Sequence, residues 1–420
     1  MVQTDEDVAR ELHNLLCQDS EAIEKVEKSG LWSLKLTGDN KLLVCDSFSR
    51  MNLKPELLRA IYSLEIEKPS IVQSRAIPEI LLGKDLVCQS KSGSGKTITF
   101  ACGALNFLKN GMGPQAIIIA PTRELAVQVG EFLQKLGSFL NIGVCLALKG
   151  RKTDKITEEI IVGTPGSLFG YFKDDLFDTS KIGFLVIDEA DAVLDPEGMG
   201  AMTHRLIMKL NRAQKIYFSA TYNADITEQI ESYSPGVIKL LEGKNEKPEE
   251  IKLFYIEIHK KDKIKALLEL YELLAIGQSI VFVSTKKYVD FLKTTFESDL
   301  HVVSCIHGDM DLNERERIVK EFKEAKSKIL ISTDVFSRGM DIPQVNLIIN
   351  FDLPIYRGTP MTETYIHRIG RSGRFGRLGF VIDFVSSEEE LKGLMKFQSD
   401  LKFPTKKFSI EALRKVVLEN

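Results

Sequence analysis

From about residue 47 onward, short apolar runs rich in Val, Ile and Phe alternate with longer amphipathic stretches such as 123–140. Near-continuous apolar strands separated by helices are typical of a parallel sheet that helices cover on both faces. The runs of the first half are 85–89, 116–120, 160–163, 184–188 and 216–220. Those of the second half are 279–284, 302–306, 329–333, 347–351 and 380–385. The pattern predicts an α/β protein with two domains in tandem, each large enough to bury its own core.

Composition indicates where these two domains begin and end. Residues 241–252 combine Gly243, Pro248 and several charged residues, which predicts a linker. We therefore expect a first domain over residues 47–240 and a second domain over residues 253–420.

Residues 1–46 form an acidic N-terminal extension with ten acidic residues and five Lys or Arg. Apolar residues at helical spacing (Val8, Leu12, Leu15 and Leu16) follow Thr4, which has the chemistry of an N-cap. This pattern predicts a short acidic helix that docks on something basic, including the rest of this chain. The alternative is a solvated, partly disordered tail.

The overall charge balance is nearly neutral. The 420 residues include 56 Lys+Arg and 59 Asp+Glu, for a net charge of −3. Taken alone, this balance argues mildly against nucleic-acid binding, because most such proteins have a basic footprint. The extension carries −5 of this charge, however, so the rest of the chain sits near +2.

Several function classes are disfavoured by composition. No apolar run reaches the roughly 18–20 residues that cross a membrane, and no secretory signal is visible at the N-terminus. The six cysteines include no C-x-x-C pair. We therefore expect reduced, mostly buried thiols and no protein-ligated zinc.

The strongest local signal is the run S-K-S-G-S-G-K-T at residues 90–97, between one predicted strand and a predicted helix. Glycines allow backbone N–H groups to point inward around phosphates, and the helix N-terminus adds partial positive charge. Lys96 would reach the β- and γ-phosphates, and Thr97 would place its hydroxyl on Mg²⁺. The predicted nucleotide-binding residues of this loop are Ser92, Gly93, Ser94, Gly95, Lys96 and Thr97. Ser90 replaces the usual first glycine, and the alternative is a flexible turn.

A second signal is the apolar run that ends in D-E-A-D at residues 188–191. Ligands of α/β sheets bind at the carboxyl ends of the strands, where these carboxylates would lie. We predict that Asp188 holds Mg²⁺ and that Glu189 orients or deprotonates the attacking water. An acidic loop after a strand is weak evidence alone, but it becomes strong beside the phosphate-binding loop.

A third signal is H-R-I-G-R-S-G-R at residues 367–374. Arg371 and Arg374 are three residues apart and can point at one target. Guanidinium groups suit phosphate oxygens and can stabilise the transition-state charge of phosphoryl transfer. The alternative is a generic basic patch.

These three motifs together resemble the DEAD-box RNA-dependent ATPases, and the resemblance runs from residue 48 to about residue 385. It implies two RecA-like domains, each a parallel sheet flanked by helices, which close over ATP and single-stranded RNA. It also implies a monomeric, Mg²⁺-dependent ATPase that clamps RNA, unwinds it locally and remodels RNA–protein complexes.

The resemblance implies roles for further residues. The implied adenine and nucleotide contacts outside the phosphate loop are Ile66, Gln73, Gly339 and Asp341. The implied RNA contacts are Pro121, Thr122, Arg123, Gly150, Thr164, Pro165, Gly166, Arg315 and Thr333. Coupling between the ATP state and RNA is implied for Asp191, Ser219, Thr221 and His367.

Four positions depart from the family pattern. Ile66 stands where an aromatic residue usually stacks on adenine. Lys149, Ser167 and Leu312 replace a glycine, an arginine and a glutamine, which thins the polar contacts to RNA. None of these changes removes a residue that hydrolysis requires.

Two details resemble the subgroup of mRNA-export helicases that acts at the cytoplasmic face of the nuclear pore. They are the insertion at residues 355–364 and the stretch 149–152 together with Ser167. The subgroup implies a cytoplasmic and nuclear location and an N-terminal extension that restrains ATP hydrolysis. Its implied partners are mRNA–protein complexes, an export mediator with inositol hexakisphosphate and a nucleoporin.

Three alternatives stay open from the sequence. A translation-initiation helicase shares the compact size and almost every motif. An ATP-locked RNA clamp would turn over little, but the intact Glu189, Arg371 and Arg374 favour turnover. A DNA translocase with the same two-domain core is disfavoured by the D-E-A-D spelling and by the absence of large accessory domains.

Overall fold

The structure, a computed structural model, describes residues 4–17, 35–36, 43–89, 95–148, 155–219, 221–222, 224–241, 251–299, 301–334, 345–372 and 378–419. The chain divides into two compact units. The N-terminal unit is Trp32–Lys244, and the C-terminal unit is Met1–Leu31 together with Asn245–Asn420. No helix within the described ranges is both long and apolar enough to cross a membrane.

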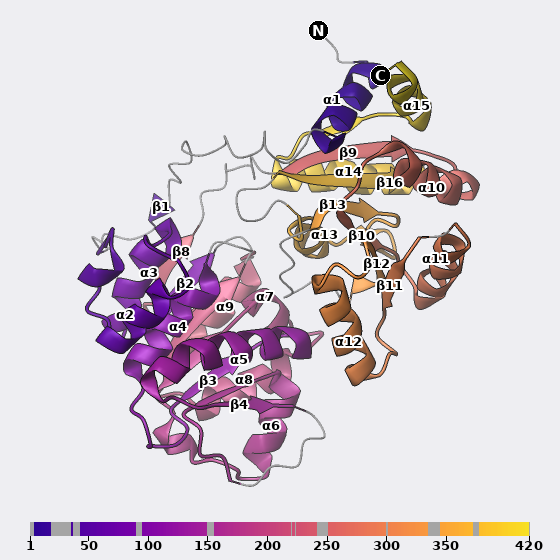
Figure 1. Cartoon of the computed structure of the whole chain (residues 1–420). Helices are drawn as coiled ribbons and strands as arrows, with labels where there is room; N and C mark the ends of the chain where they lie inside the picture. Colours follow the sequence, from indigo (N-terminus) through magenta and orange to yellow (C-terminus); the bar gives the residue numbers. More distant parts are fainter. Residues whose placement is uncertain are drawn as a thin grey trace. The chain divides into compact units, whose positions relative to one another are not determined.

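The N-terminal unit contains one sheet with the spatial order β1-β8-β2-β7-β6-β3-β5-β4 (Figure 1). Its strands are β1 Lys35–Leu36, β2 Leu86–Gln89, β3 Ala116–Ile119, β4 Val144–Ala147, β5 Ile160–Gly163, β6 Phe184–Ile187, β7 Gln214–Ser219 and β8 Ile238–Leu241. Every pairing from β8 to β4 is parallel, whereas β1 is added antiparallel to β8. The prediction of a parallel sheet is confirmed.

Helices cover both faces of this sheet because successive strand residues point to opposite sides. Ile118 joins the core beneath the helices α2 Pro55–Tyr62, α3 Ile71–Leu81, α4 Lys96–Phe107 and α5 Arg123–Gly137. Its neighbour Ile119 joins the core beneath α6 Pro165–Lys173, α7 Ala190–Val193, α8 Gly200–Lys209 and α9 Ala224–Tyr233. The sheet is therefore the middle layer of a three-layer unit.

The C-terminal unit repeats this plan with the spatial order β11-β12-β10-β13-β16-β9-β17, all parallel. Its strands are β9 Ile251–Glu257, β10 Gln278–Phe282, β11 Val303–Ile306, β12 Ile329–Ser332, β13 Val345–Asn350, β16 Gly379–Val385 and β17 Thr405–Lys407. One face packs against α1 Asp5–Cys17, α10 Lys263–Leu273, α11 Lys286–Ser298 and α15 Ile410–Glu419. The other face packs against α12 Leu312–Lys323, α13 Thr362–Ile369 and α14 Glu388–Leu401. Two tandem α/β sheets of the RecA-like kind are thus present, as predicted.

Small elements complete the two units. The 3₁₀ helices are η2 Phe48–Arg50, η3 Ser138–Leu140, η4 Thr179–Lys181 and η5 Lys260–Asp262. A two-stranded antiparallel hairpin, β14 Ile355–Tyr356 and β15 Thr359–Pro360, occupies the insertion noted in the sequence.

The predicted linker at residues 241–252 is too long at both ends. Leu241 is the last residue of β8. Ile251 and Lys252 already belong to β9, where they pair with Gly379 and Phe380 of β16. The charged residues and Pro248 suggested a linker, but the backbone groups of residues 251 and 252 are used in the sheet ladder. Residues 242–250 lie outside the described residues.

The predicted N-terminal helix is present as α1, and it packs within the C-terminal unit. Thr4 and Asp7 cap it reciprocally, since each accepts a hydrogen bond from the backbone N–H of the other, at 3.2 and 3.0 Å. Val8, Ala9 and Leu12 are almost fully buried against α15 and β17. Figure 1 shows α1, in indigo, alongside α15.

Charge pairs fix α1 on this surface. Glu11 forms ion pairs with Lys252 of β9 at 2.9 Å and with Lys406 of β17 at 2.6 Å. Glu6 is paired with Lys415 of α15 at 2.8 Å. Partial burial raises the pKa of Glu11, but the hydrogen bonds from the two lysines outweigh it and hold that pKa below its usual value. The acidic helix therefore docks on basic residues of its own chain.

We predict that Leu12→Ala lowers the free energy of unfolding of the C-terminal unit by about 2–5 kcal/mol, because it leaves a cavity under α1. Asn14→Ala, on the exposed side of the same helix, should change it by less than about 0.5 kcal/mol. Urea denaturation followed by circular dichroism measures both, with hydrogen exchange in α15 as a local readout. Equal midpoints for the two variants would show that the α1 contact contributes nothing.

Candidate nucleotide and RNA site

In the N-terminal unit, the predicted site residues follow the carboxyl ends of five neighbouring strands. Along the edge of the sheet, the order is β2, β7, β6, β3 and β5. The phosphate-binding loop follows β2, Thr221 follows β7 and Asp188 follows β6. Thr122 and Thr164 follow β3 and β5. The residues predicted to bind nucleotide and those predicted to bind RNA thus occupy two adjacent halves of one edge.

Gln73 ties the segment predicted to read adenine to the start of α4. Its Oε1 accepts from the backbone N–H of Ser70 at 2.8 Å, and its Nε2 donates to the carbonyl of Gly95 at 3.4 Å. The Ser70 hydroxyl in turn accepts from the N–H of Gln73, which completes a capping box on α3. A primary amide has two N–H groups and two lone pairs. These two bonds use one lone pair of Oε1 and one N–H of Nε2.

Gly95 marks the point where the phosphate-binding loop enters α4. Its φ is +90°, a left-handed conformation that side chains rarely adopt. A Cβ atom here would lie 2.3 Å from Nε2 of Gln73. This position therefore requires glycine. Lys96 and Thr97 begin α4 and are half-buried, and Ile66 packs at the margin of the core under the same face.

The carboxylates of the D-E-A-D segment are buried at the end of β6. Asp188 and Glu189 are each 5% exposed. Burial raises the pKa of Asp188 to about 6, against the lowering effect of the Lys96 charge, and Glu189 and Asp191 raise it further. Glu189 has a φ of 48°, and this strain, of about 1–2 kcal/mol for a residue with a Cβ, is typical of functional sites.

The donor groups here fit Mg²⁺. A buried carboxylate with a raised pKa is stabilised by a nearby cation, and Asp188 and the Thr97 hydroxyl offer the oxygen ligands that Mg²⁺ prefers. Within the described ranges, no group of three or more His, Cys, Asp or Glu could hold a metal by itself. This donor set suits an ion that takes most of its ligands from water and phosphates.

Asp191 connects the D-E-A-D segment to the predicted coupling segment after β7. Its Oδ2 accepts a hydrogen bond from the Thr221 hydroxyl at 2.8 Å. The hydroxyl of Ser219, a fully buried residue, accepts from the N–H of Thr221 at 3.3 Å. The segment that contains Asp188 and Glu189 is therefore connected, through the bond between Asp191 and Thr221, to the end of the neighbouring strand β7.

Two helix N-termini lie together at the RNA half of the edge. Thr122 caps α5 by accepting from the N–H of Leu125 at 3.2 Å, and Thr164 is the N-cap of α6. β3 and β5 are paired with Ile119 opposite Gly163, so these caps are neighbours. Helix N-termini bind phosphate groups through backbone N–H groups. The Thr164 hydroxyl also donates to the Ser167 hydroxyl at 3.2 Å. Ser167, which replaces the arginine of the family pattern, thus bonds to the N-cap of its own helix.

The other predicted RNA residues of this unit take their places beside these caps. Pro121 and Pro165 are buried, whereas Arg123 is half-buried and Gly166 is exposed. Arg123 and Pro165 are the first residues of α5 and α6. The arrangement presents a backbone-lined surface with one arginine, which suits a sugar–phosphate chain.

The C-terminal unit carries its predicted residues at the carboxyl edge as well. Arg315 of α12 donates to the carbonyls of His307 and Gly308, at 3.3 and 3.2 Å, in the turn that follows β11. Thr333 follows β12 directly. His367 and Arg371 are both buried, and Arg371 Nε donates to the carbonyl of His367 at 3.0 Å.

Seven predicted site residues lie outside the described residues. They are Ser92, Gly93, Ser94, Gly150, Gly339, Asp341 and Arg374. Their roles stay predictions.

One polar cluster was missed by the sequence analysis. Tyr365 and Arg368 of α13 and Asn350 and Asp383 of the sheet beneath it are almost fully buried and are bonded to one another. A usable signal was present, because Asp383 interrupts the apolar run of β16 and a buried carboxylate needs partners.

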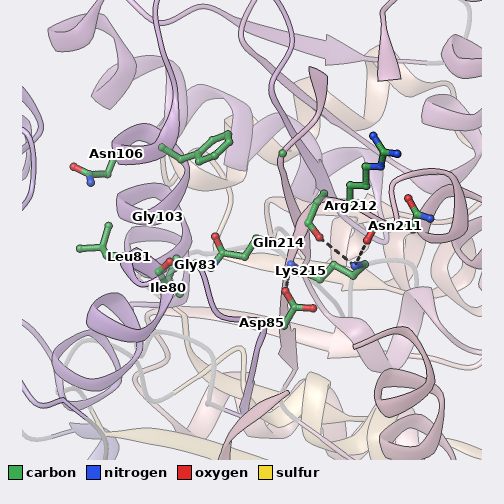
Figure 2. Close-up of a pocket in the computed structure, with 13 residues that line it drawn as sticks. Ile80, Leu81, Gly83, Asp85, Gly103, Asn106, Asn211, Arg212, Gln214 and Lys215 are labelled. Atoms are coloured by element: carbon green, nitrogen blue, oxygen red, sulfur yellow. Dashed lines mark hydrogen bonds between the residues drawn. The ribbon is translucent and has the colours of Figure 1, made fainter. Parts of the chain in front are cut away.

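A pocket of about 590 Å³ lies elsewhere in the N-terminal unit, and Figure 2 draws the residues that line it. Its lining residues Asp85, Gly183 and Gln214 lie at the amino ends of β2, β6 and β7, opposite the edge described above. Lys215 Nζ donates to the carbonyls of Asn211 and Ala213 there, both at 3.1 Å. This cavity is therefore separate from the candidate nucleotide site.

Comparison with known proteins decides the family. The family model "DEAD/DEAH box helicase" matches residues 70–229, and "Helicase conserved C-terminal domain" matches residues 262–376. The ATP-dependent RNA helicase FAL1 of Candida glabrata is 40% identical over 368 residues, which are 84% of this chain and 90% of that protein. The chain belongs to the DEAD-box ATP-dependent RNA helicases.

Other DEAD-box relatives have similar identities. The ATP-dependent RNA helicase DBP5 of Saccharomyces cerevisiae is 37% identical over 409 residues, covering 94% of this chain and 85% of that protein. Eukaryotic initiation factor 4A-3 of Arabidopsis thaliana is 40% identical over 357 residues, covering 83% and 85%.

Solved structures show the same fold. S. cerevisiae Dbp5 bound to RNA and ADP BeF3 has a TM-score of 0.83 and 37% identity, over 89% of this chain and 100% of that chain. A further Dbp5 structure, bound to Nup159, Gle1, IP6 and ADP, has a TM-score of 0.62 and 36% identity, over 88% and 100%.

We predict that Gly95→Ala raises the KM for ATP by about tenfold or more, because a left-handed conformation costs residues with a Cβ about 1–2 kcal/mol and the new atom displaces Gln73. Gly170→Ala in α6, where a Cβ meets nothing within 4 Å, is the matched control and should leave the KM unchanged. ATP titrations of RNA-stimulated hydrolysis measure both. Similar values for the two variants would refute the requirement for glycine at residue 95.

Proposed function

We propose that this DEAD-box helicase remodels mRNA–protein complexes during mRNA export through the nuclear pore. The observation that carries this proposal is the extent of the similarity to DBP5, which aligns over 94% of the chain at 37% identity, whereas the FAL1 relatives align over 84–87% at 38–40% identity. The solved Dbp5 complex with Nup159, Gle1 and IP6 adds support.

The insertion that suggested the export subgroup is a packed element of the C-terminal unit. Its hairpin contacts α14, and a Cβ at Gly393 of that helix would lie 2.4 Å from Ile355 and 3.8 Å from Pro360. Glycine at residue 393 therefore makes room for the hairpin. The hairpin is therefore a packed part of the fold with space left for it at Gly393, which supports membership in a subgroup that carries this insertion.

The proposed chemistry assigns ATP to the phosphate-binding loop, with Lys96 at the β- and γ-phosphates and Gln73 at adenine. Asp188 and Thr97 would hold Mg²⁺, which would supply charge neutralisation at the phosphates. Glu189 orients and deprotonates the attacking water, and Arg371 and Arg374 stabilise charge on the transferred phosphoryl group.

The proposed RNA site includes the paired N-termini of α5 and α6, with Arg315 and Thr333 in the C-terminal unit. Contacts of this kind reach the sugar–phosphate backbone, so we expect little base specificity. Asp191, Thr221 and His367 would couple the ATP state to RNA.

The same proposal assigns partners and a location. An export mediator acting with inositol hexakisphosphate and a cytoplasmic-side nucleoporin would bind this helicase, as a monomer, in the cytoplasm, in the nucleus and at the pore. A translation-initiation role is the second candidate, because the initiation-factor relative is 40% identical over 83% of the chain.

Affinity purification of the tagged, full-length protein from its own cells tests the biological role. An export helicase should recover nucleoporins and the export mediator, and addition of inositol hexakisphosphate should increase recovery of the mediator. Recovery of translation-initiation factors without nucleoporins would overturn the export role and leave the helicase assignment intact.

We predict that Glu189→Gln abolishes ATP turnover while ATP-dependent RNA binding is retained, because the substitution removes only the proton acceptor. Glu197→Gln makes the same chemical change at an exposed residue of the same unit and should behave as wild type. Phosphate release with single-stranded RNA, with DNA and with no nucleic acid measures turnover, and wild type should respond to RNA alone. Normal turnover of Glu189→Gln would remove its assigned role.

A further inference from the structure

We propose that the buried cluster Asn350, Tyr365, Arg368 and Asp383 positions Arg371 for ATP hydrolysis by fixing helix α13 on the sheet. The proposal rests on the proposed function, because that function assigns the phosphoryl group to Arg371. None of the four residues needs to touch ATP, so they are positioning residues.

The cluster lies where polar groups are costly. Asn350 and Asp383 are 0% exposed, and Tyr365 and Arg368 are each 1% exposed. Asn350 is the last residue of β13, and it lies opposite Asp383 of β16 in the strand pairing. Buried polar groups destabilise a protein unless they are hydrogen-bonded. The cluster therefore has to be satisfied internally and in one arrangement.

Asp383 is held from both sides. Its Oδ1 accepts from Asn350 Nδ2 at 2.7 Å, and its Oδ2 accepts from the Tyr365 hydroxyl at 2.6 Å. Burial raises the pKa of Asp383 to about 6, although these two hydrogen bonds and the nearby charge of Arg368 act to lower it. The positive charge of Arg368 thus favours the ionised form of this carboxyl, and burial opposes it.

Arg368 joins α13 to three other segments. Its Nη1 donates to Asn350 Oδ1 at 3.1 Å and to the carbonyl of Asp352 at 2.7 Å. Its Nε donates to Asp334 Oδ1 at 2.7 Å, and its guanidinium lies over the Phe282 ring at 5.0 Å from the centroid. Because the guanidinium fork is planar and rigid, these bonds specify one orientation of the helix.

The position of Arg371 depends on the orientation of α13. Tyr365, Arg368 and Arg371 are spaced three residues apart, so the first two anchors lie on one side of α13. α13 ends at Ile369, and Arg371 follows within one turn, with its Nε bonded to the carbonyl of His367. Any rotation of α13 therefore moves Arg371, and a misplacement of about 1 Å can cost roughly 100-fold in rate.

The stacked ring of Tyr365 allows a precise perturbation. The ring stacks on Phe397 with centroids 4.4 Å apart, so Tyr365→Phe keeps the packing and removes only the bond to Asp383. Tyr271→Phe is the matched control, because its hydroxyl is also hydrogen-bonded, to Ser279 at 2.6 Å, on the opposite face of the same sheet.

We predict that Tyr365→Phe lowers the kcat of RNA-stimulated ATP hydrolysis about tenfold, while the KM for ATP changes less than about twofold. The reason is that losing the bond between the Tyr365 hydroxyl and Asp383 affects the position of Arg371 and leaves ATP binding intact. Tyr271→Phe should lose comparable thermal stability and keep its kcat. Rates are compared per folded protein. If both variants keep wild-type kcat, the cluster has only a structural role and the proposal is overturned.

A donor–acceptor exchange provides the rescue test. Asn350→Asp alone places two carboxylates against each other and should reduce kcat. Adding Asp383→Asn reverses the bond between these positions and keeps an acceptor for both Arg368 and Tyr365. We expect the double variant to recover at least half of wild-type kcat. Failure of the rescue in a folded double variant would count against the proposal, whereas absence of RNA-stimulated hydrolysis in wild type would refute the assigned function first.

Discussion

The whole structure depends on one constraint, which is that every central strand is parallel and buried on both faces. Such strands leave little room for polar side chains along their length, as the wholly buried β3, β5 and β6 illustrate. Polar residues are therefore concentrated in the loops at the strand ends, and the few inside the sheet are bonded to one another, as Asn350 and Asp383 are. At the carboxyl edge, helix N-termini and loop backbone also supply N–H groups to anions. The residues predicted to bind nucleotide and RNA follow the strand ends at this edge.

Buried polar groups that do occur join one element to another. Asp191 is bonded to Thr221 and thereby connects the loops after β6 and β7. Gln73 connects the start of α3 to the start of α4. Asp383 and Arg368 connect α13 to β13 and β16. In each case the cost of burial makes a loosely bonded arrangement unfavourable, so the bonds define the relative positions of reactive groups.

Most strands and all three motifs could be predicted from local sequence. The strands that escaped prediction differ in pattern from the rest. β4 alternates between half-buried and buried residues, and β17 is the polar edge strand Thr405–Lys407. β9 begins directly after a charged stretch with a proline and was partly assigned to the linker. β4 and β17 are edge strands, whereas β9 lies between β16 and β17. Pairing partners, rather than local hydrophobicity alone, make these segments strands.

The sequence by itself determined the family of this protein and predicted its chemistry: the phosphate-binding loop, the D-E-A-D carboxylates and the arginine motif are local patterns that can be recognised without the fold. Tertiary structure alone decided which of these patterns become neighbours. The order β2-β7-β6-β3-β5 is set by long-range pairing, and it brings Thr122 beside Thr164. Tertiary structure also decided where α1 packs, because Glu11 is bonded to lysines about 240 and 395 residues away. Burial and pairing act between segments distant in sequence, and local patterns do not encode such contacts.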